Sequence, residues 1–154
     1  MNPVQLRPFK IEDYNEVHAL WASTEGIGLS ESDAREAVAA FRERNPGLSL
    51  AAVSEGRIVG AVLCGHDGRR GYLHHLAVCP DWRRRGVGRA IVRQCLERLK
   101  TAGIPKCNLF LYADNAAGEV FWRRLGWTVR ADLHLVQRPT SSADANEKSR
   151  CKSC

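Results

Sequence analysis

Four arginines and two glycines stand together in R-R-R-G-V-G-R, residues 83 to 89. Arginine binds phosphate oxygens well, because its planar guanidinium group donates several hydrogen bonds at once. Glycines let an anion approach the backbone N–H groups closely, since they carry no side chain. Apolar residues at helical spacing follow from Val87 to Leu99, so we expect a helix that begins near Arg84 or Arg85. Its unpaired N–H groups and its dipole would favour a phosphate or pyrophosphate.

The glycine spacing distinguishes three kinds of phosphate loop. A nucleotide-hydrolase P-loop requires a lysine after its glycines, and a dinucleotide loop requires a third glycine where Ile91 stands. The pattern R-x-x-G-x-G from Arg83 to Gly88, after an apolar strand, fits without exception. The alternative interpretation of the arginine run is a solvated basic face or a nucleic-acid-binding patch. No other basic cluster or stacking aromatic surface accompanies the arginines, so we expect no nucleic-acid partner.

Two longer segments, L-H-H-L-A-V-C-P-D-W-R-R-R-G-V-G-R-A-I-V and N-L-F-L-Y-A-D-N-A-A-G-E-V-F-W-R-R-L-G-W, follow one another in this order. The first has a strand ending in L-A-V, a proline and the arginine–glycine turn. The second has a helix that begins after an asparagine and ends in a leucine–glycine–aromatic triplet. On these motifs, the chain from about Val4 to about Arg138 resembles the GNAT family of N-acetyltransferases, which move acetyl from acetyl-coenzyme A to an amine. The stretches G-I-G-L-S-E-S-D and C-G-H-D-G-R-R-G-Y-L-H-H are similar to a bacterial branch known from its member YpeA.

The resemblance implies an α/β (α+β mixed sheet) fold of the acyl-CoA N-acyltransferase type, with six to seven strands and about four helices. It also implies acetyl-coenzyme A as the acetyl donor. A peptide-like pantetheine arm can bind to an open strand edge as an added strand does. The residues implied for the donor lie on that strand, on the pyrophosphate loop and on the last helix: Leu76, Ala77, Val78, Arg83, Arg84, Arg85, Gly86, Val87, Gly88, Arg89, Asn115 and Trp122.

The family's usual proton donor cannot be assigned to this sequence. Many members carry a tyrosine after the phenylalanine of the last helix, and it protonates the departing thiolate. Trp122 stands at that position, and an indole N–H does not give up its proton near neutral pH. Tyr72 and Tyr112 are the candidate acids. A thiolate is also a tolerable leaving group without an acid, since a thiol has a pKa of about 8.5.

The attacking amine must lose a proton, because an alkylamine with a pKa of about 10.4 arrives charged. Strand alternation in Y-L-H-H-L-A-V places His74 on one face with Tyr72 and Val78, and His75 on the other. His74 is the candidate base, since histidine titrates in the useful range and arylalkylamine acetyltransferases place a catalytic histidine at a similar offset. A packed polar role is the alternative, and a bulge would reverse the faces. The weaker candidates are His18, His66, His75 and His134.

Residues 23 to 33, S-T-E-G-I-G-L-S-E-S-D, break the helical pattern where the family builds its acceptor wall. The nearest carboxylates are Glu25, Glu31 and Asp33, so a cationic amine of a small molecule or an exposed protein amine is the expected partner. Helix capping by Ser32 or Asp33 explains the same residues.

Periodicity and turn residues predict the remaining elements. Strands are expected at 4–9, 72–80, 106–113 and 127–138, the last as a strand pair or one bent strand. Two further strands are expected within 48–66, joined by a hairpin turn at Glu55–Gly56. Helices are expected at 13–22 with Val17, Leu20 and Trp21 on one face, from a Ser32 cap past Phe41, from the arginine run to about Leu99, and after an Asn115 cap.

The chain of 154 residues suits one domain, expected at 1–138. A disordered tail is expected at 139–154, whose single C-x-x-C lacks the second pair of a four-cysteine zinc site, so no metal is expected. No apolar run approaches the roughly 20 residues of a membrane span, and the N-terminus lacks a signal peptide's apolar centre. Cysteines at irregular spacing in apolar stretches favour reduced thiols in the cytoplasm.

Two functions from different classes remain open on the sequence. The first is an acetyltransferase acting on an amine, and the net charge of +6 suits its anionic donor. The second is a catalytically idle coenzyme A-binding module, which the missing tyrosine would explain. A homodimer is open for either.

Overall fold

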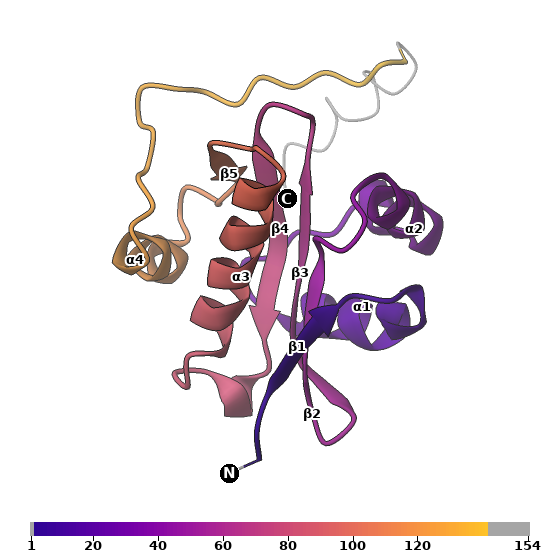
Figure 1. Ribbon diagram of the computed structural model, residues 1–154. Coiled ribbons are helices and arrows are strands. Elements are labelled where there is room, and N and C mark those ends of the chain that lie inside the picture. Colours follow the sequence, from indigo (N-terminus) through magenta and orange to yellow (C-terminus); the bar gives the residue numbers. More distant parts are fainter. Residues whose placement is uncertain (1, 142–154) are drawn as a thin grey trace.

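The computed structural model describes residues 2–141, and its centre is a five-stranded mixed sheet (Figure 1). The strands lie in chain order, antiparallel from β1 to β4, and β5 runs parallel to β4. Their bounds are β1 Gln5–Pro8, β2 Leu50–Ser54, β3 Arg57–His66, β4 Gly71–Val78 and β5 Cys107–Leu109. A two-residue turn with positive φ at Glu55 and Gly56 joins β2 to β3, as the sequence predicts.

Helices cover both faces of the sheet (Figure 1). α1 (Tyr14–Ser23) and α2 (Arg35–Arg44) lie on one face, and α3 (Val87–Thr101) lies on the other with α4 (Ala116–Arg124) beside it. Three short 3-10 helices connect them: η1 Ile11–Asp13, η2 Glu31–Asp33 and η3 Pro80–Trp82. Each face therefore has its own apolar core, one beneath α1 and α2 and one beneath α3.

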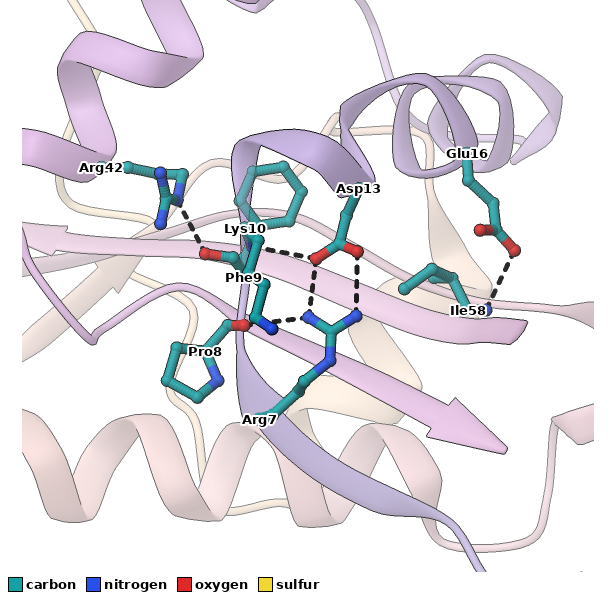
Figure 2. A network of polar contacts seen from close by, with 8 residues as sticks. All are labelled: Arg7, Pro8, Phe9, Lys10, Asp13, Glu16, Arg42 and Ile58. Carbon is teal, nitrogen blue, oxygen red and sulfur yellow. Dashed lines mark hydrogen bonds and ion pairs between the residues drawn. The ribbon is translucent and has the colours of Figure 1, made fainter. Parts of the chain in front are cut away.

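Polar contacts connect β1 to η1 and connect α1 to β3 (Figure 2). The Arg7 guanidinium donates to both carboxylate oxygens of Asp13 at 2.7 and 2.8 Å, and the N–H of Lys10 donates to the same carboxylate. The Glu16 carboxylate accepts the N–H of Ile58 at 3.0 Å. These contacts hold η1 and α1 against β1 and β3.

The mixed sheet and its four α-helices in the described part of the chain confirm the expected fold class. Residues 2–141 form five strands rather than six to seven, because residues 127–138 form no strand. The Arg130 guanidinium donates to the Asp132 carboxylate at a turn, but the residues on either side of it do not pair as strands, and almost no side chain is buried. The buried strand expected at 106–113 is also too long, since β5 ends at Leu109 and Phe110 is exposed.

The predicted domain limits and tail are only partly described. Residues 142–154, which include Cys151 and Cys154 and most of the expected tail, lie outside the described residues. Within residues 2–141, no helix has the length and apolar character needed to cross a membrane.

Candidate active site

β4 and β5 run side by side only at their first residues. Their register holds for three residue pairs, the last of which joins Leu73 to Leu109. β4 continues to Val78, and no strand of the described chain pairs with residues 74–78 on this side. The open edge can take an extended, amide-bearing arm as an added strand. It includes the three residues that the family resemblance implies for such an arm, Leu76, Ala77 and Val78.

The loop between β4 and α3 contains two residues with positive φ, Arg84 at 60° and Gly86 at 79°. Left-handed residues in such turns can direct neighbouring N–H groups toward one point, which makes a nest for an anion. α3 begins at Val87, and its first unpaired N–H groups adjoin the loop. The predicted helix start at Arg84 or Arg85 is wrong, because both residues lie in the turn before the helix.

The four predicted arginines are exposed on this loop and on the first turn of α3. Arg83 Nε donates to the carbonyl oxygen of Val78 at 3.0 Å, so this side chain braces the end of β4. The Arg85 guanidinium lies 5.4 Å from the ring centre of Trp82. Arg84 and Arg89 form no ion pair among the described residues, and both are available to a phosphate.

The two glycines of the loop have different structural roles. A Cβ at Gly86 would meet no atom within 4 Å, so this residue supplies a backbone conformation and open space. A Cβ at Gly88 would lie 3.3 Å from Cζ of Phe121 and 3.6 Å from Cγ2 of Val78. Gly88 therefore lets α4 approach the start of α3. Phe121 borders the loop, although the sequence did not single it out.

A β-bulge at His75 changes which side chains of β4 share a face. The register steps from Ala61 opposite Ala77 to Leu63 opposite His74, so β4 has one extra residue there, and His75 has a φ of 57°. His74 faces α2, whereas Val78 packs into the core beneath α3. The prediction that His74 and Val78 share a face is wrong, and the extra residue is the reason.

His74 stands among aromatic rings where β4 and β5 separate. Its ring lies parallel to Tyr72 with centroids 6.1 Å apart, and it lies 6.0 Å from Phe41 and 6.2 Å from Phe110. Burial lowers the pKa of His74, and His75 lowers it further, while Asp33 has the opposite effect. The imidazole is therefore neutral near pH 7 and can accept a proton.

The Asp33 carboxylate forms hydrogen bonds within the protein, so it is not free to bind an acceptor amine. It is 5% exposed, its Oδ1 lies 2.8 Å from His75 Nε2, and its Oδ2 accepts the N–H of Ser30 at 2.9 Å. Ser30 and Asp33 form a capping box around η2. The cap predicted at Ser32 is wrong, since it is the Ser30 hydroxyl that accepts the Ser32 N–H. The other two predicted carboxylates are exposed: Glu25 and Glu31.

The loop after α1 packs against the segment that follows β5. The hydroxyl of Tyr112 lies so close to Gly28 that any Cβ there would overlap it. A Cβ at Gly26 would lie 2.7 Å from the side-chain nitrogen of Asn115. Both glycines thus let this loop lie close to the Tyr112 and Asn115 side chains. In the sequence, these glycines indicated only a break in the helical pattern. Asn115 also accepts the N–H of Gly118 at 2.9 Å, as the predicted cap of α4.

Trp122 belongs to an aromatic cluster on α4. Its ring lies edge-on to Phe121 at 5.1 Å and to Trp127 at 5.0 Å, and it packs against the core beneath α3. The sequence missed Trp127 as its partner, although the triplet that ends the helix contains it.

The chain matches the model of the Acetyltransferase (GNAT) family over residues 14–127. It is 29% identical over 133 residues to an acetyltransferase of Sodalis glossinidius, with 86% of this chain and 93% of the relative covered. It is 30% identical over 135 residues to an uncharacterized N-acetyltransferase of Yersinia pestis, with 88% and 95% covered.

Solved structures share the fold at low identity. A PaiA N-acetyltransferase of Thermoplasma acidophilum, in complex with coenzyme A, matches with a TM-score of 0.72 at 19% identity, with 83% of this chain and 91% of that chain covered. An aminoglycoside 6'-N-acetyltransferase of Acinetobacter haemolyticus matches with 0.72 at 17% identity, with 89% and 99% covered. The family match and the bacterial relatives agree with the open edge of β4 and the arginine–glycine loop: the chain belongs to the GNAT family and is an N-acetyltransferase that uses acetyl-coenzyme A.

Proposed function

We propose that the protein transfers acetyl directly to a primary amine in a ternary complex, with His74 as the proton acceptor. The observation that carries the proposal is the place of His74. It is a half-buried imidazole with a lowered pKa, and it lies where β4 and β5 separate, next to the open edge of β4. A neutral imidazole at such a place can deprotonate an incoming ammonium group.

The donor would be held by the residues of the open edge and the loop. The backbone of Leu76–Val78 would pair with the pantetheine arm, and the N–H groups from Arg84 to Arg89 would bind the pyrophosphate. Arg84 and Arg89 would add charge-assisted hydrogen bonds. The coenzyme A complex of the Thermoplasma acidophilum protein supports this assignment by likeness of fold.

The chemical step moves two protons away from the ammonium nitrogen, one to His74 and one to the departing sulfur. His74 takes a proton from the ammonium, directly or through a water, and the amine nitrogen then attacks the thioester carbonyl carbon. The carbon–sulfur bond breaks, the thiolate leaves with the electron pair, and the second proton of the attacking nitrogen passes to that sulfur, directly or through the phenol that acts as the acid. Tyr72 is the proposed acid, since its ring stacks on His74 and it shares the opening. Tyr112 is the alternative acid from the opposite segment.

The acceptor is a primary amine of a small molecule or an exposed protein amine. Glu25 and Glu31 are the carboxylates proposed to attract its charge, because both are exposed in and beside the loop that meets Tyr112. We place the reaction in the cytoplasm, which suits the free thiols of Cys64, Cys79, Cys95 and Cys107.

The test is acetyl transfer to a panel of amines by the parent, by His74→Ala and by Trp122→Phe. We expect His74→Ala to lower the rate about 10²–10⁴-fold and to remove the ascending limb of the pH profile. Raising the pH should partly restore the rate, because more of the amine then arrives neutral. Trp122→Phe should change the rate modestly and leave the profile alone, since an indole gives up no proton.

Two outcomes would contradict the proposal. An inert His74→Ala change with a severe loss at Trp122→Phe would assign the chemistry to an indole hydrogen bond at the sulfur. Tight binding of acetyl-coenzyme A without transfer to any amine of the panel would favour the idle binding module.

A further inference from the structure

The contact between Asp33 and His75 joins η2 to the bulge of β4. Side-chain exposure is 7% for Asp33 and 20% for His75, and the Oδ1–Nε2 distance is 2.8 Å. The Tyr14 hydroxyl donates to the backbone carbonyl of Asp33 at 2.6 Å, which fixes η2 to α1 as well. The Trp21 ring packs on the imidazole with centroids 5.2 Å apart. Three elements thus meet around one partly buried hydrogen bond.

His75 holds a backbone conformation that histidine adopts rarely. Its φ of 57° lies in the left-handed region, where a Cβ crowds the backbone. Such a conformation persists only when surrounding contacts compensate for its cost. The bond to Asp33 and the packing on Trp21 are the side-chain contacts that hold it there.

The bulge decides where His74 points. Without the extra residue, alternation would turn His74 to the face of Val78, beneath α3, and away from Phe41. With it, His74 faces α2 among Phe41, Tyr72 and Phe110.

We propose that Asp33 and His75 are positioning residues for acetyl transfer: their hydrogen bond holds the β4 bulge and thereby places His74 at the opening between β4 and β5. This inference rests on the proposed role of His74 as proton acceptor. Residues 24–33, which we propose to border the acceptor amine, thereby gain a second function. Asp33 at the end of this segment is hydrogen-bonded to the strand that carries the base.

The pKa of His74 reports on the Asp33–His75 pair, because both residues shift it. Two titratable groups interact with the pair, His74 on β4 and Tyr14 on α1, and the charged groups Arg35 and Glu36 of α2 interact with Tyr14. Burial is the largest cause that lowers the pKa of His74; His75 lowers it further, and Asp33 raises it. Loss of the Asp33 charge should therefore lower the pKa of His74, and loss of His75 should raise it.

The first experiment follows the imidazole titration of His74 by NMR in the full chain, and it does not depend on activity. We expect the pKa of His74 to fall in Asp33→Asn and to rise in His75→Gln. Glu43→Gln is the matched control, since it removes one exposed carboxylate from α2. An Asp33→Asn titration that coincides with that of Glu43→Gln would overturn the proposal.

The second experiment separates the bulge from the fold as a whole. Both variants lose the hydrogen bond to Asp33, but glycine adopts positive φ readily, so His75→Gly should retain the rate better than the strained His75→Ala. We expect kcat to fall about 10- to 100-fold in His75→Ala, the cost of a small misplacement, with the Kd for acetyl-coenzyme A nearly unchanged. Equal kcat in the two variants would contradict a positioning role.

The outcomes also separate this inference from the proposed function. If the NMR shifts occur but His74→Ala transfers acetyl normally, the positioning contact stands and His74 is not the base. If His74→Ala is inactive but neither Asp33→Asn nor His75→Ala alters the titration or kcat, the base stands and the positioning role is refuted.

Discussion

The rings of His74 and Phe110 face one another across the point where β4 and β5 part, with centroids 6.2 Å apart. His74 is the first residue of β4 beyond the paired register, and Phe110 directly follows β5. The candidate base is thus shielded on one side by a ring that is itself 59% exposed.

Phe110→Ala should raise the pKa of His74 toward its ordinary value, because burial is the main cause of its lowering. A base with a raised pKa stays protonated to higher pH, so the ascending limb of the rate profile should move to higher pH. The free energy of unfolding should change little, since the ring is mostly exposed. Rate profiles and NMR titration of the variant measure both effects. Leu96→Ala is the control, since Leu96 is also an exposed apolar residue. If the ascending limb of the rate profile stays at the same pH in Phe110→Ala, Phe110 does not shield His74.

Gly86→Val should reduce the affinity for acetyl-coenzyme A by about tenfold or more, because a β-branched side chain fills the anion site and resists positive φ. Gly68→Val is a matched control. Gly68 has a φ of 92° and open space around it, but it lies in the turn between β3 and β4. Both variants should lose similar stability in thermal unfolding, and only Gly86→Val should bind the donor weakly in calorimetry. Equal donor affinity for the two variants would refute the loop assignment.

Gly28→Ala and Tyr112→Phe should show coupled effects, because a Cβ at Gly28 overlaps the Tyr112 hydroxyl. Removal of that hydroxyl should relieve part of the loss that Gly28→Ala causes in the KM for the amine. A double-mutant cycle should give a coupling energy of about 0.5–3 kcal/mol, as contacting residues commonly do. Strict additivity would mean that the loop and Tyr112 do not meet in solution.

Asp13→Asn should lower stability at neutral pH, and the loss should shrink in acid. Burial alone would raise the pKa of Asp13, but the hydrogen bonds from Arg7 and Lys10 outweigh it and the pKa lies below its usual range. The stabilisation is therefore complete above the unfolded pKa of about 3.9 and is lost as pH falls through the lower folded pKa. We expect a loss of about 0.5–1 kcal/mol at pH 7 after solvent screening, from urea titrations at several pH values. Glu12→Gln is the exposed control, and a loss independent of pH would contradict the ionic contribution.

Local sequence signals predicted most of the fold. The spacing of Val17, Leu20 and Trp21 identified the buried face of α1, and Glu55–Gly56 identified the turn between β2 and β3. Signals of this kind depend on residues near one another in sequence, so a single chain suffices to read them.

The parts that the sequence missed depend on contacts between distant residues. The bulge at His75 is held by Asp33, and strand alternation cannot reveal it. The apolar pattern at 127–138 is compatible with a strand, but a strand also needs a paired edge, and that segment has none. The roles of Gly26 and Gly28 likewise depend on Asn115 and Tyr112, which follow β5.

The short register between β4 and β5 has a consequence for local opening. Backbone pairing joins β5 to the sheet through three residue pairs, and α4 contributes no fully buried residue to the core. A unit with so few buried contacts opens at lower free energy than the β1–β4 meander, so its amide hydrogens should exchange with solvent first. A donor that binds both the β4 edge and the α4 side would close this unit by mass action. Protection from exchange in residues 107–124 therefore measures occupancy of the donor site without any turnover.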